Sequence, residues 1–477
     1  MAGPASKCWP GWLSRTPQLP PQSSPATPLC PPLMRHQLLS LLRPASLLVL
    51  LALLLPTRSH AQNPLLPGYF ADPSIKKFGD TYYLYVTTDG YPPYGNDGLT
   101  FVWTSTNLTD WQPQVLDGMP YKSVWAPAVI KGKNGKYYLY CQNSVDYKGY
   151  VYVADSPTGH YARVAHIGGF DIEPFEDPVS KKIYVVSASQ EIFEMDNDPA
   201  SPTYLTKIAR TISVKGHFDF TEAPYLFYRK GLYYLMWAGG RCWQKSYNVR
   251  YAVAKSLEGP YVDAKAPLLE NDEAHGVIGP GHNSMLEVEG RTFLLYHRQD
   301  PAKAPTCGFR FTCASELTFG ADGSLKLGAY VNDLGQLLGA KNPVVNLALN
   351  KPVFANTELP TNRAIHAVDG RHDTRWTTSP NEKGTLTVDL QREEPIRRVE
   401  VDFEYPDKQV TFRVEYSTDN ENWVTLVDHS NEAIPAYRAM AIDKDFRARY
   451  VRLAVTNSED RNASVWELKV LGPGFAR

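Results

Sequence analysis

Three carboxylates, Asp72, Asp171 and Glu222, each lie within three residues of a proline in a short element that recurs along the chain. A carboxyl group kept protonated by apolar or anionic surroundings protonates a leaving oxygen, whereas an ionised one activates water or attacks a sugar. A third carboxylate beside the acid raises the pKa of that acid by like-charge repulsion. A single acid next to a proline is more often a turn former, but three recurring acids that meet in one pocket would suit cleavage of a glycosidic bond.

A repeat through the first two thirds of the chain predicts how such distant acids meet. Short turns lead five times into an aromatic strand, and equivalent aromatic residues lie 46 to 59 residues apart. These aromatic residues are Tyr83, Tyr138, Tyr184, Tyr234 and Phe293. A period of roughly 40 to 50 residues with several short strands is typical of β-propeller blades. We therefore expect an all-β fold with a five-bladed propeller, whose innermost strands bring the acids to a common axis.

The elements that hold the acids also have a specific order. They are three of five recurring elements, which read Ala71-Asp72-Pro73-Ser74-Ile75, Trp125-Ala126-Pro127, Phe170-Asp171-Ile172-Glu173-Pro174-Phe175, Thr221-Glu222-Ala223-Pro224-Tyr225-Leu226 and Gly279-Pro280-Gly281-His282. Together they resemble glycoside hydrolase family 43, whose five-bladed propellers cleave arabinose- and xylose-containing plant polysaccharides with inversion. The resemblance runs from about residue 63 to residue 327.

The resemblance implies a role for each acid. Asp72 matches the general base, Glu222 the general acid, and Asp171 the residue that tunes the pKa of the acid and orients it. Ile172 replaces a proline that is common in the family. An alternative alignment therefore places Glu173 in the tuning role, although we favour Asp171.

Three further residues are candidates for contact with the substrate. His282 resembles an axial histidine that helps to hold a central ion or water in many family members. Arg298 is expected to contact a sugar hydroxyl or one of the acids. Trp125 lies beside a proline at the axial end of the second blade, where it either floors the sugar pocket or packs in the core.

The last third of the chain has a different pattern. Short strands with period-two alternation, separated by polar turns over residues 345–474, indicate a β-sandwich of jelly-roll type. The segment resembles the discoidin, or factor V/VIII C-type, domain and its sugar-binding branch, carbohydrate-binding module family 32. That resemblance implies a structural calcium held by Asp369, Asp373 and Glu467, since calcium favours flexible oxygen ligands. Alternatively, Asp369 and Asp373 only shape a turn.

Composition excludes several classes of partner. The 477 residues suffice for two domains, and a net charge of −1 gives no sign of a nucleic-acid partner. None of the six cysteines has metal-ligand spacing. Cys307 and Cys313 either form a disulfide in an oxidising compartment, or Cys313 is a buried thiol.

The N-terminus predicts export. An apolar run at residues 45–55 follows Arg35 and Arg43, is too short for an ordinary membrane span, and precedes small residues up to Ala61. We therefore expect a secreted or periplasmic protein. The expected order is a non-native extension (1–33), a signal peptide (34–61), the propeller (63–330), a linker (331–344) and the discoidin-like domain (345–474).

These patterns together predict a secreted, inverting glycosidase that acts on plant cell-wall glycans. The expected activity is that of an exo-acting α-L-arabinofuranosidase or a β-xylosidase, with an oligo- or polysaccharide substrate and no cofactor needed for the chemistry. An ion at the propeller axis would only support the structure. The alternatives are a galactan- or galactofuranose-directed glycosidase, a glycan-binding protein without chemistry, and an adhesive surface protein.

Overall fold

The computed structural model describes residues 62–90, 98–122, 124–339, 345–438, 441–457 and 462–473. The propeller and the C-terminal domain belong to one compact unit, Ser59–Arg477. The N-terminal extension and the signal peptide predicted at residues 1–33 and 34–61 lie outside the described residues. Within the described ranges, no helix is both long and apolar enough to span a membrane.

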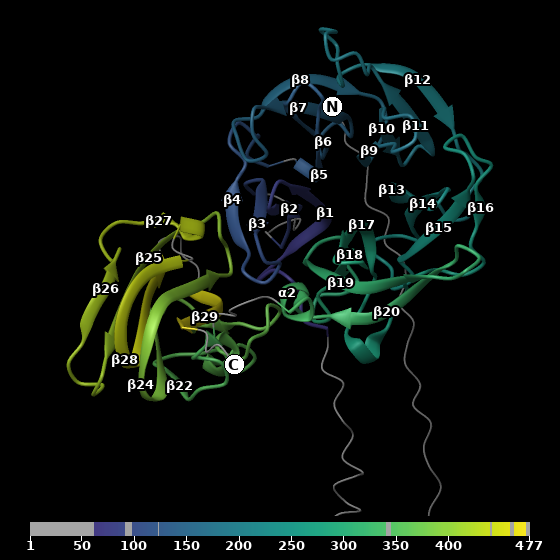
Figure 1. The fold of residues 1–477 in the computed structure, drawn as a ribbon. Coiled ribbons are helices and arrows are strands. Elements are labelled where there is room, and N and C mark those ends of the chain that lie inside the picture. Colours follow the sequence, from purple (N-terminus) through teal and green to yellow (C-terminus); the bar gives the residue numbers. More distant parts are fainter. Residues whose placement is uncertain are drawn as a thin grey trace, which may run out of the picture. The chain divides into compact units, whose positions relative to one another are not determined.

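Five four-stranded antiparallel sheets form the predicted propeller (Figure 1). In each sheet the strands follow one another in sequence order, and the first strands of neighbouring sheets contact one another around a closed ring. The blades are β1 (Phe70–Phe78), β2 (Thr81–Thr88), β3 (Phe101–Ser105) and β4 (Gln112–Val115); β5 (Val124–Lys131), β6 (Tyr137–Asn143), β7 (Gly149–Ala154) and β8 (Ala162–Ile167); β9 (Ile172–Glu176), β10 (Ile183–Ser187), β11 (Glu191–Met195) and β12 (Ile208–Ser213); β13 (Glu222–Arg229), β14 (Leu232–Gly239), β15 (Asn248–Ala254) and β16 (Val262–Asp263); and β17 (Gly281–Val288), β18 (Arg291–Gln299), β19 (Arg310–Phe319) and β20 (Leu325–Val331).

Apolar clusters between neighbouring blades hold the ring together. In the cluster that closes the ring, Leu84 and Trp103 of the first blade pack with Leu295 of the fifth. Four aromatic residues of the sequence repeat, Tyr138, Tyr184, Tyr234 and Phe293, lie in these clusters, and the fifth, Tyr83, packs against one of them. The repeat therefore marks the surface on which blades pack, where aromatic rings bury much apolar area.

Each inner strand begins with the same backbone distortion. A non-glycine residue with φ between 44° and 58° occupies the equivalent position in every blade. These residues are Asp72, Ala126, Asp171, Ala223 and His282. In four blades the strand register also shifts at this point, as in a β-bulge. Bulges re-aim side chains, and left-handed backbone in non-glycine residues is concentrated at functional sites.

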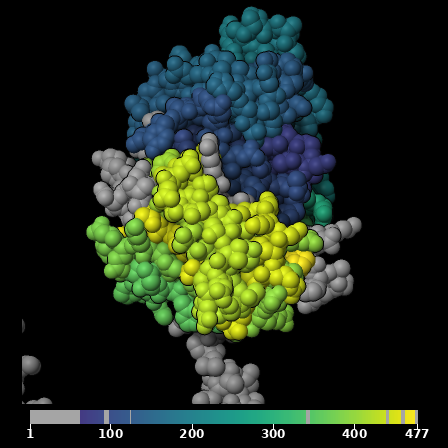
Figure 2. Space-filling model, turned by 90° about the vertical axis from the view of Figure 1, so that its left-hand side faces the viewer, coloured from purple at the N-terminus to yellow at the C-terminus, as the bar shows by residue number. Residues whose placement is uncertain are grey.

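The C-terminal domain is a nine-stranded antiparallel sheet around one apolar core. Its longest strands, β24 (Gly384–Phe403) and β28 (Ala441–Asn457), pair with each other, and register shifts interrupt this pairing. The predicted sandwich is thus one continuous hydrogen-bonded sheet. The surface of this domain is coloured green to yellow in Figure 2. The other strands are β21 (Val345–Asn346), β22 (Val353–Ala355), β23 (Trp376–Thr377), β25 (Gln409–Ser417), β26 (Val424–Asp428), β27 (Ile434–Pro435) and β29 (Ser464–Gly472).

Helical structure in the described ranges is limited to short segments. The helix α2 (Leu334–Leu337) lies within the predicted linker, where Asp333 caps it by accepting a hydrogen bond from the backbone N–H of Gln336. Single 3₁₀ turns occur at Glu273–His275, Ala364–Ala367 and Ala436–Arg438. The fold of the described residues is all-β, as predicted.

The disulfide joins a pair of cysteines other than the one considered from the sequence. Cys242 is bonded to Cys307, whereas Cys313 and Cys141 are buried free thiols. Cys313 lies inside β19 and packs in the apolar cluster between the fourth and fifth blades. A loop-to-loop bond between residues 65 positions apart gave no local signal in the sequence.

Candidate active site

Asp72, Asp171 and His282 meet at the axis of the propeller. Nδ1 of His282 lies 3.4 Å from Oδ1 of Asp72 and 3.6 Å from Oδ2 of Asp171. The aspartates belong to the first and third blades, and the histidine to the fifth. The first and fifth blades are neighbours, but the third blade is adjacent to neither of them, so Asp171 reaches the other two side chains only across the axis. The expected convergence of distant acids is therefore present, with an imidazole between two of them.

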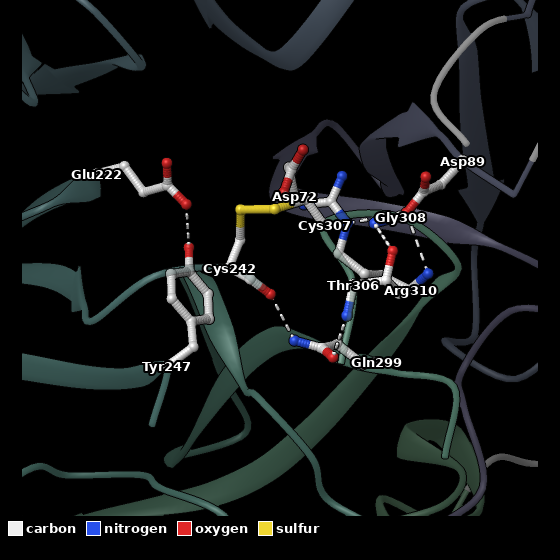
Figure 3. The surroundings of a disulfide bond; sticks show 10 residues. All are labelled: Asp72, Asp89, Glu222, Cys242, Tyr247, Gln299, Thr306, Cys307, Gly308 and Arg310. Atoms are coloured by element: carbon white, nitrogen blue, oxygen red, sulfur yellow. Dashed lines mark hydrogen bonds and ion pairs between the residues drawn. A yellow bond between two sulfur atoms is a disulfide. The ribbon is translucent and has the colours of Figure 1, made fainter. Parts of the chain in front are cut away.

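Asp72 is held in its ionised form. Burial alone would raise its pKa, but the Arg310 guanidinium, with Nη1 2.9 Å from Oδ1 of Asp72, and His282 hold the pKa well below its usual range. Nδ1 of His297 also lies 3.0 Å from Oδ1 of Asp72. Arg310 is itself fixed by Asp89, whose Oδ2 accepts a hydrogen bond from Nε at 2.8 Å (Figure 3). A buried, ionised carboxylate suits a group that must accept a proton from water.

Glu222 has the opposite tendency. Burial raises its pKa, and repulsion by Asp171 and Asp72 raises it further. The hydroxyl of Tyr247 donates a 2.6 Å hydrogen bond to Oε1 of Glu222 and partly counteracts the rise (Figure 3). The carboxyl thus stays protonated to a higher pH than an ordinary glutamate, as a proton donor must.

Asp171 connects the third and fourth blades. Its Oδ2 accepts a 2.7 Å hydrogen bond from the backbone N–H of Ala223, which is adjacent to Glu222. Its own N–H donates to Oε1 of Gln142 at 3.0 Å. Burial, followed by repulsion from Asp72, raises the pKa of Asp171 even though His282 opposes the rise. Asp171 therefore both positions the backbone beside Glu222 and contributes to the raised pKa of that acid.

Glu173, the alternative to Asp171, has a different environment. Its Oε1 lies 2.7 Å from Nζ of Lys76 and accepts a 3.1 Å hydrogen bond from Ser74. Nζ of Lys76 also lies 5.9 Å from the ring centroid of Tyr225. These residues come from the first, third and fourth blades, so the ammonium group lies at the axis. A metal ion does not fit among these residues, because a lysine cation already neutralises the glutamate.

This axial ion pair predicts a large effect on stability. Lys76→Met should lower the free energy of unfolding by about 3–5 kcal/mol, because it leaves Glu173 buried without a counter-charge. Urea unfolding would measure the change. The matched control is the double variant Lys76→Met with Glu173→Leu, which should recover much of the loss. If Lys76→Met alone were as stable as the wild type, Glu173 would not depend on Lys76 as its counter-charge.

Trp125 is half-buried beside the cluster. Its ring centroid lies 6.0 Å from that of Tyr147, and Tyr147 lies 6.5 Å from Phe170, the residue before Asp171. The side chain of Tyr147 is exposed. This arrangement gives one side of the cluster an aromatic wall and is compatible with Trp125 contacting a sugar.

Arg298 does not lie among the acids. It is fully buried, and its Nη2 pairs with Oδ2 of Asp373 at 2.5 Å and donates to the carbonyl of Gln62 at 2.9 Å. Successive side chains of a strand point to opposite faces, so His297, which reaches Asp72, excludes its neighbour Arg298 from that face. The expected contact of Arg298 with sugar or acid is therefore wrong.

Sequence reasoning missed three residues that contact the acids, namely Arg310, His297 and Tyr247. His297 stood next to the candidate Arg298, and strand alternation allowed only one of them to face the axis. Arg310 and Tyr247 follow loops and belong to no recurring element. Gly281 gives an indirect signal for Tyr247, because a Cβ at position 281 would lie 1.8 Å from the tyrosine ring.

The sequence model described as "Glycosyl hydrolases family 43" matches residues 61–325, more than half of the chain. The chain belongs to this family. As a family 43 member it is a glycosidase that acts with inversion of configuration. A second model, "F5/8 type C domain", matches residues 354–468, which assigns the C-terminal sheet to the discoidin domains.

Individual proteins agree with the family 43 assignment. The β-D-galactofuranosidase xynD of Aspergillus niger is 27% identical over 328 residues, covering 59% of this chain and 93% of that protein. The non-reducing end α-L-arabinofuranosidase BoGH43B of Bacteroides ovatus is 27% identical over 311 residues, covering 59% of this chain and 57% of its own length. A solved structure named "Glycoside hydrolase" has the same fold over 86% of this chain and 99% of its own, with a TM-score of 0.71 and 22% identity.

The discoidin domain of this family 43 glycosidase brings two of the three predicted calcium ligands together. Burial raises the pKa of Asp369 and raises that of Glu467 well above its usual range, and the two carboxylates interact. Oε2 of Glu467 is buried without a hydrogen-bond partner. Asp373 instead pairs with Arg298 and with Arg371 at 2.7 Å. Across the described residues, no group of three or more His, Cys, Asp and Glu side chains has the arrangement of a metal site.

Proposed function

We propose that this protein is an exo-acting α-L-arabinofuranosidase or β-xylosidase that acts on plant cell-wall glycans, with Asp72 as general base and Glu222 as general acid. The observation that supports these roles is the opposite direction of the two pKa shifts, since an inverting pair needs one ionised and one protonated carboxyl group. Asp171 is proposed to tune the acid, because it repels the ionised form of Glu222 and binds the backbone of Ala223.

The proposed reaction uses only groups of this chain. Asp72 takes a proton from a water molecule, whose oxygen bonds to the anomeric carbon while the glycosidic C–O bond breaks. Glu222 gives its proton to the departing oxygen, so the two carboxyl groups exchange protonation states over one turnover. Burial lowers the pKa of His282, but Asp171 and Asp72 raise it overall, which favours the cationic form that attracts both aspartates.

The choice of sugar rests on the relatives. An arabinofuranosidase and a galactofuranosidase both match at 27% identity, and both names describe furanose sugars. The second candidate is therefore a galactofuranosidase, favoured by the match over 93% of that relative. A glycan-binding protein without chemistry is disfavoured, because a lectin does not need three buried acids with divergent pKa values.

The test is hydrolysis by the protein that begins at Gln62, the expected start of the exported form. Substrates would be 4-nitrophenyl glycosides of arabinofuranose, xylose and galactofuranose, followed by arabinan, arabinoxylan and arabinogalactan. Release of a single sugar would support exo action and name the substrate. Glycan binding without turnover on the entire panel would overturn the proposal. Export is supported by the Cys242–Cys307 disulfide, which persists in oxidising compartments.

For the discoidin domain, we propose that Asp369 and Glu467 hold a calcium ion that stabilises the fold. Carboxylate oxygens are suitable calcium ligands, and the ion would relieve the repulsion between these two side chains. Calcium is therefore expected to raise the melting temperature of the wild type and EDTA to lower it. Glu467→Gln should abolish the response, while Glu421→Gln, an exposed control in the same domain, should keep it. An unchanged response in Glu467→Gln would refute the site.

A further inference from the structure

The segment Arg241–Tyr247 between β14 and β15 reaches the proposed acid. Tyr247, at its end, holds Glu222 by the 2.6 Å hydrogen bond. Cys242, near its start, packs against an apolar cluster that contains Ala223, the residue after Glu222. The leaving group of a glycoside must lie beside the acid that protonates it. Both ends of this segment are therefore next to the space that a leaving sugar occupies.

The segment is held rigidly from two sides. The disulfide joins Cys242 to Cys307, and the carbonyl of Cys242 accepts a 2.7 Å hydrogen bond from Nε2 of Gln299 (Figure 3). Oε1 of the same glutamine accepts from the backbone N–H of Thr306 at 3.0 Å. Gln299 thus ties together the two loops that the disulfide already joins, so the segment is fixed relative to the fifth blade.

The segment also closes tightly on itself. Gly240 has φ of +80°, and a Cβ there would lie 2.8 Å from the carbonyl oxygen of Ser246. The backbone N–H of Gln244 donates to the carbonyl oxygen of Arg241 at 2.8 Å, and the backbone N–H of Tyr247 donates to the carbonyl oxygen of Gln244 at 3.2 Å. These turns leave little freedom to the residue at the tip, Trp243.

Trp243 is exposed on this rigid support. Its side chain is 57% exposed, and Arg241 places its guanidinium carbon 6.0 Å from the ring centroid. A large exposed indole buries no core area, so a binding role explains it better than folding does. Its flat apolar face with an adjacent cation matches a sugar ring, which offers C–H groups on one face and hydroxyls at its edge.

We propose that Arg241–Tyr247 forms the subsite for the sugar on the leaving-group side of the scissile bond, with Trp243 as its platform and the Cys242–Cys307 disulfide as its brace. The inference rests on the proposed role of Glu222 as the acid. It assigns Trp243 to specificity for the leaving group rather than to the chemistry. Cys242, the residue before Trp243, packs beside the acid. Among the described residues, Trp243 itself has no contact with Asp72, Asp171 or His282.

The test compares two substrates with the same transferred sugar. One is an unsubstituted oligosaccharide, whose leaving group is a sugar, and the other is the glycosyl fluoride, whose leaving group is too small to reach the subsite. Trp243→Ala should lower kcat/KM on the oligosaccharide about tenfold, which corresponds to about 1.4 kcal/mol. On the fluoride the variant should stay within about twofold of the wild type. Phe354→Ala, at an exposed aromatic residue of the C-terminal domain, is the matched control and should change neither value.

The disulfide is tested by a double-variant cycle. Cys242→Ser with Cys307→Ser should weaken oligosaccharide turnover, and Trp243→Ala should have a smaller effect in that background than in the wild type. If the serine variant fails to fold, brief reduction of the folded wild type with dithiothreitol gives the same comparison.

Equal losses on both substrates, or no loss on the oligosaccharide, would overturn the subsite. A wild type that hydrolyses neither substrate would instead count against the proposed function, so the two failures are distinguishable.

Discussion

Glu222→Gln is expected to lower kcat about 10³-fold on substrates with a sugar leaving group, and less than about tenfold on a 2,4-dinitrophenyl glycoside. A sugar alkoxide leaves only with a proton, whereas dinitrophenolate leaves without one, and general acid catalysis contributes roughly 10² to 10⁴ in rate. Glutamine keeps the size of the side chain but has no acidic proton to transfer to the leaving oxygen. Steady-state kinetics on a series of leaving groups would measure the difference, and an equal loss on all of them would refute the acid role.

The pH profile tests the same residue independently. A raised pKa keeps Glu222 protonated as the pH rises, so activity should fall on the alkaline side as the carboxyl ionises. The hydrogen bond from Tyr247 favours the ionised form, and Tyr247→Phe should therefore move the alkaline limb to higher pH. Glu222→Gln should remove this limb. A limb that stays in place in both variants would belong to another group.

The propeller was predictable because its packing is periodic in the sequence. Blades pack through equivalent residues, so Tyr138, Tyr184 and Tyr234 recur at nearly constant spacing and are buried between sheets. The same regularity made the acids visible, since each lies at the start of an inner strand. The structure shows that the three acids do not occupy the same position in their blades. Asp72 and Asp171 themselves have the positive φ, whereas in the fourth blade Ala223 has it and Glu222 is the residue before.

The contacts that set the pKa values were not predictable from the repeat. Arg310 reaches Asp72 from the start of β19, and Tyr247 reaches Glu222 from a loop, so neither shares a position with other blades. The disulfide between Cys242 and Cys307 likewise joins two irregular loops. Loops of different blades have different lengths and sequences, and only the folded ring brings them together. The sequence repeat therefore identifies the acids but not the residues that shift their pKa values.

Asp72→Asn is expected to lower kcat about 10³-fold or more on every substrate, including the dinitrophenyl glycoside and the glycosyl fluoride. The base acts on the attacking water, so a better leaving group cannot replace it. Arg310 and His282 keep the pKa of Asp72 low, and the wild type should therefore retain its active, ionised base well into the acidic range.

Asp89→Asn provides the matched control for Asp72→Asn. Asp89 is also a buried carboxylate that contacts Arg310, but it has no hydrogen bond or ion pair with the other acids among the described residues. Its replacement loosens Arg310 without removing the base, and a loss of less than about tenfold is expected. A comparable loss in both variants would mean that Asp72 acts only by positioning Arg310. A uniform loss with Asp72→Asn, set against the leaving-group dependence of Glu222→Gln, would separate the base from the acid without any structure of a complex.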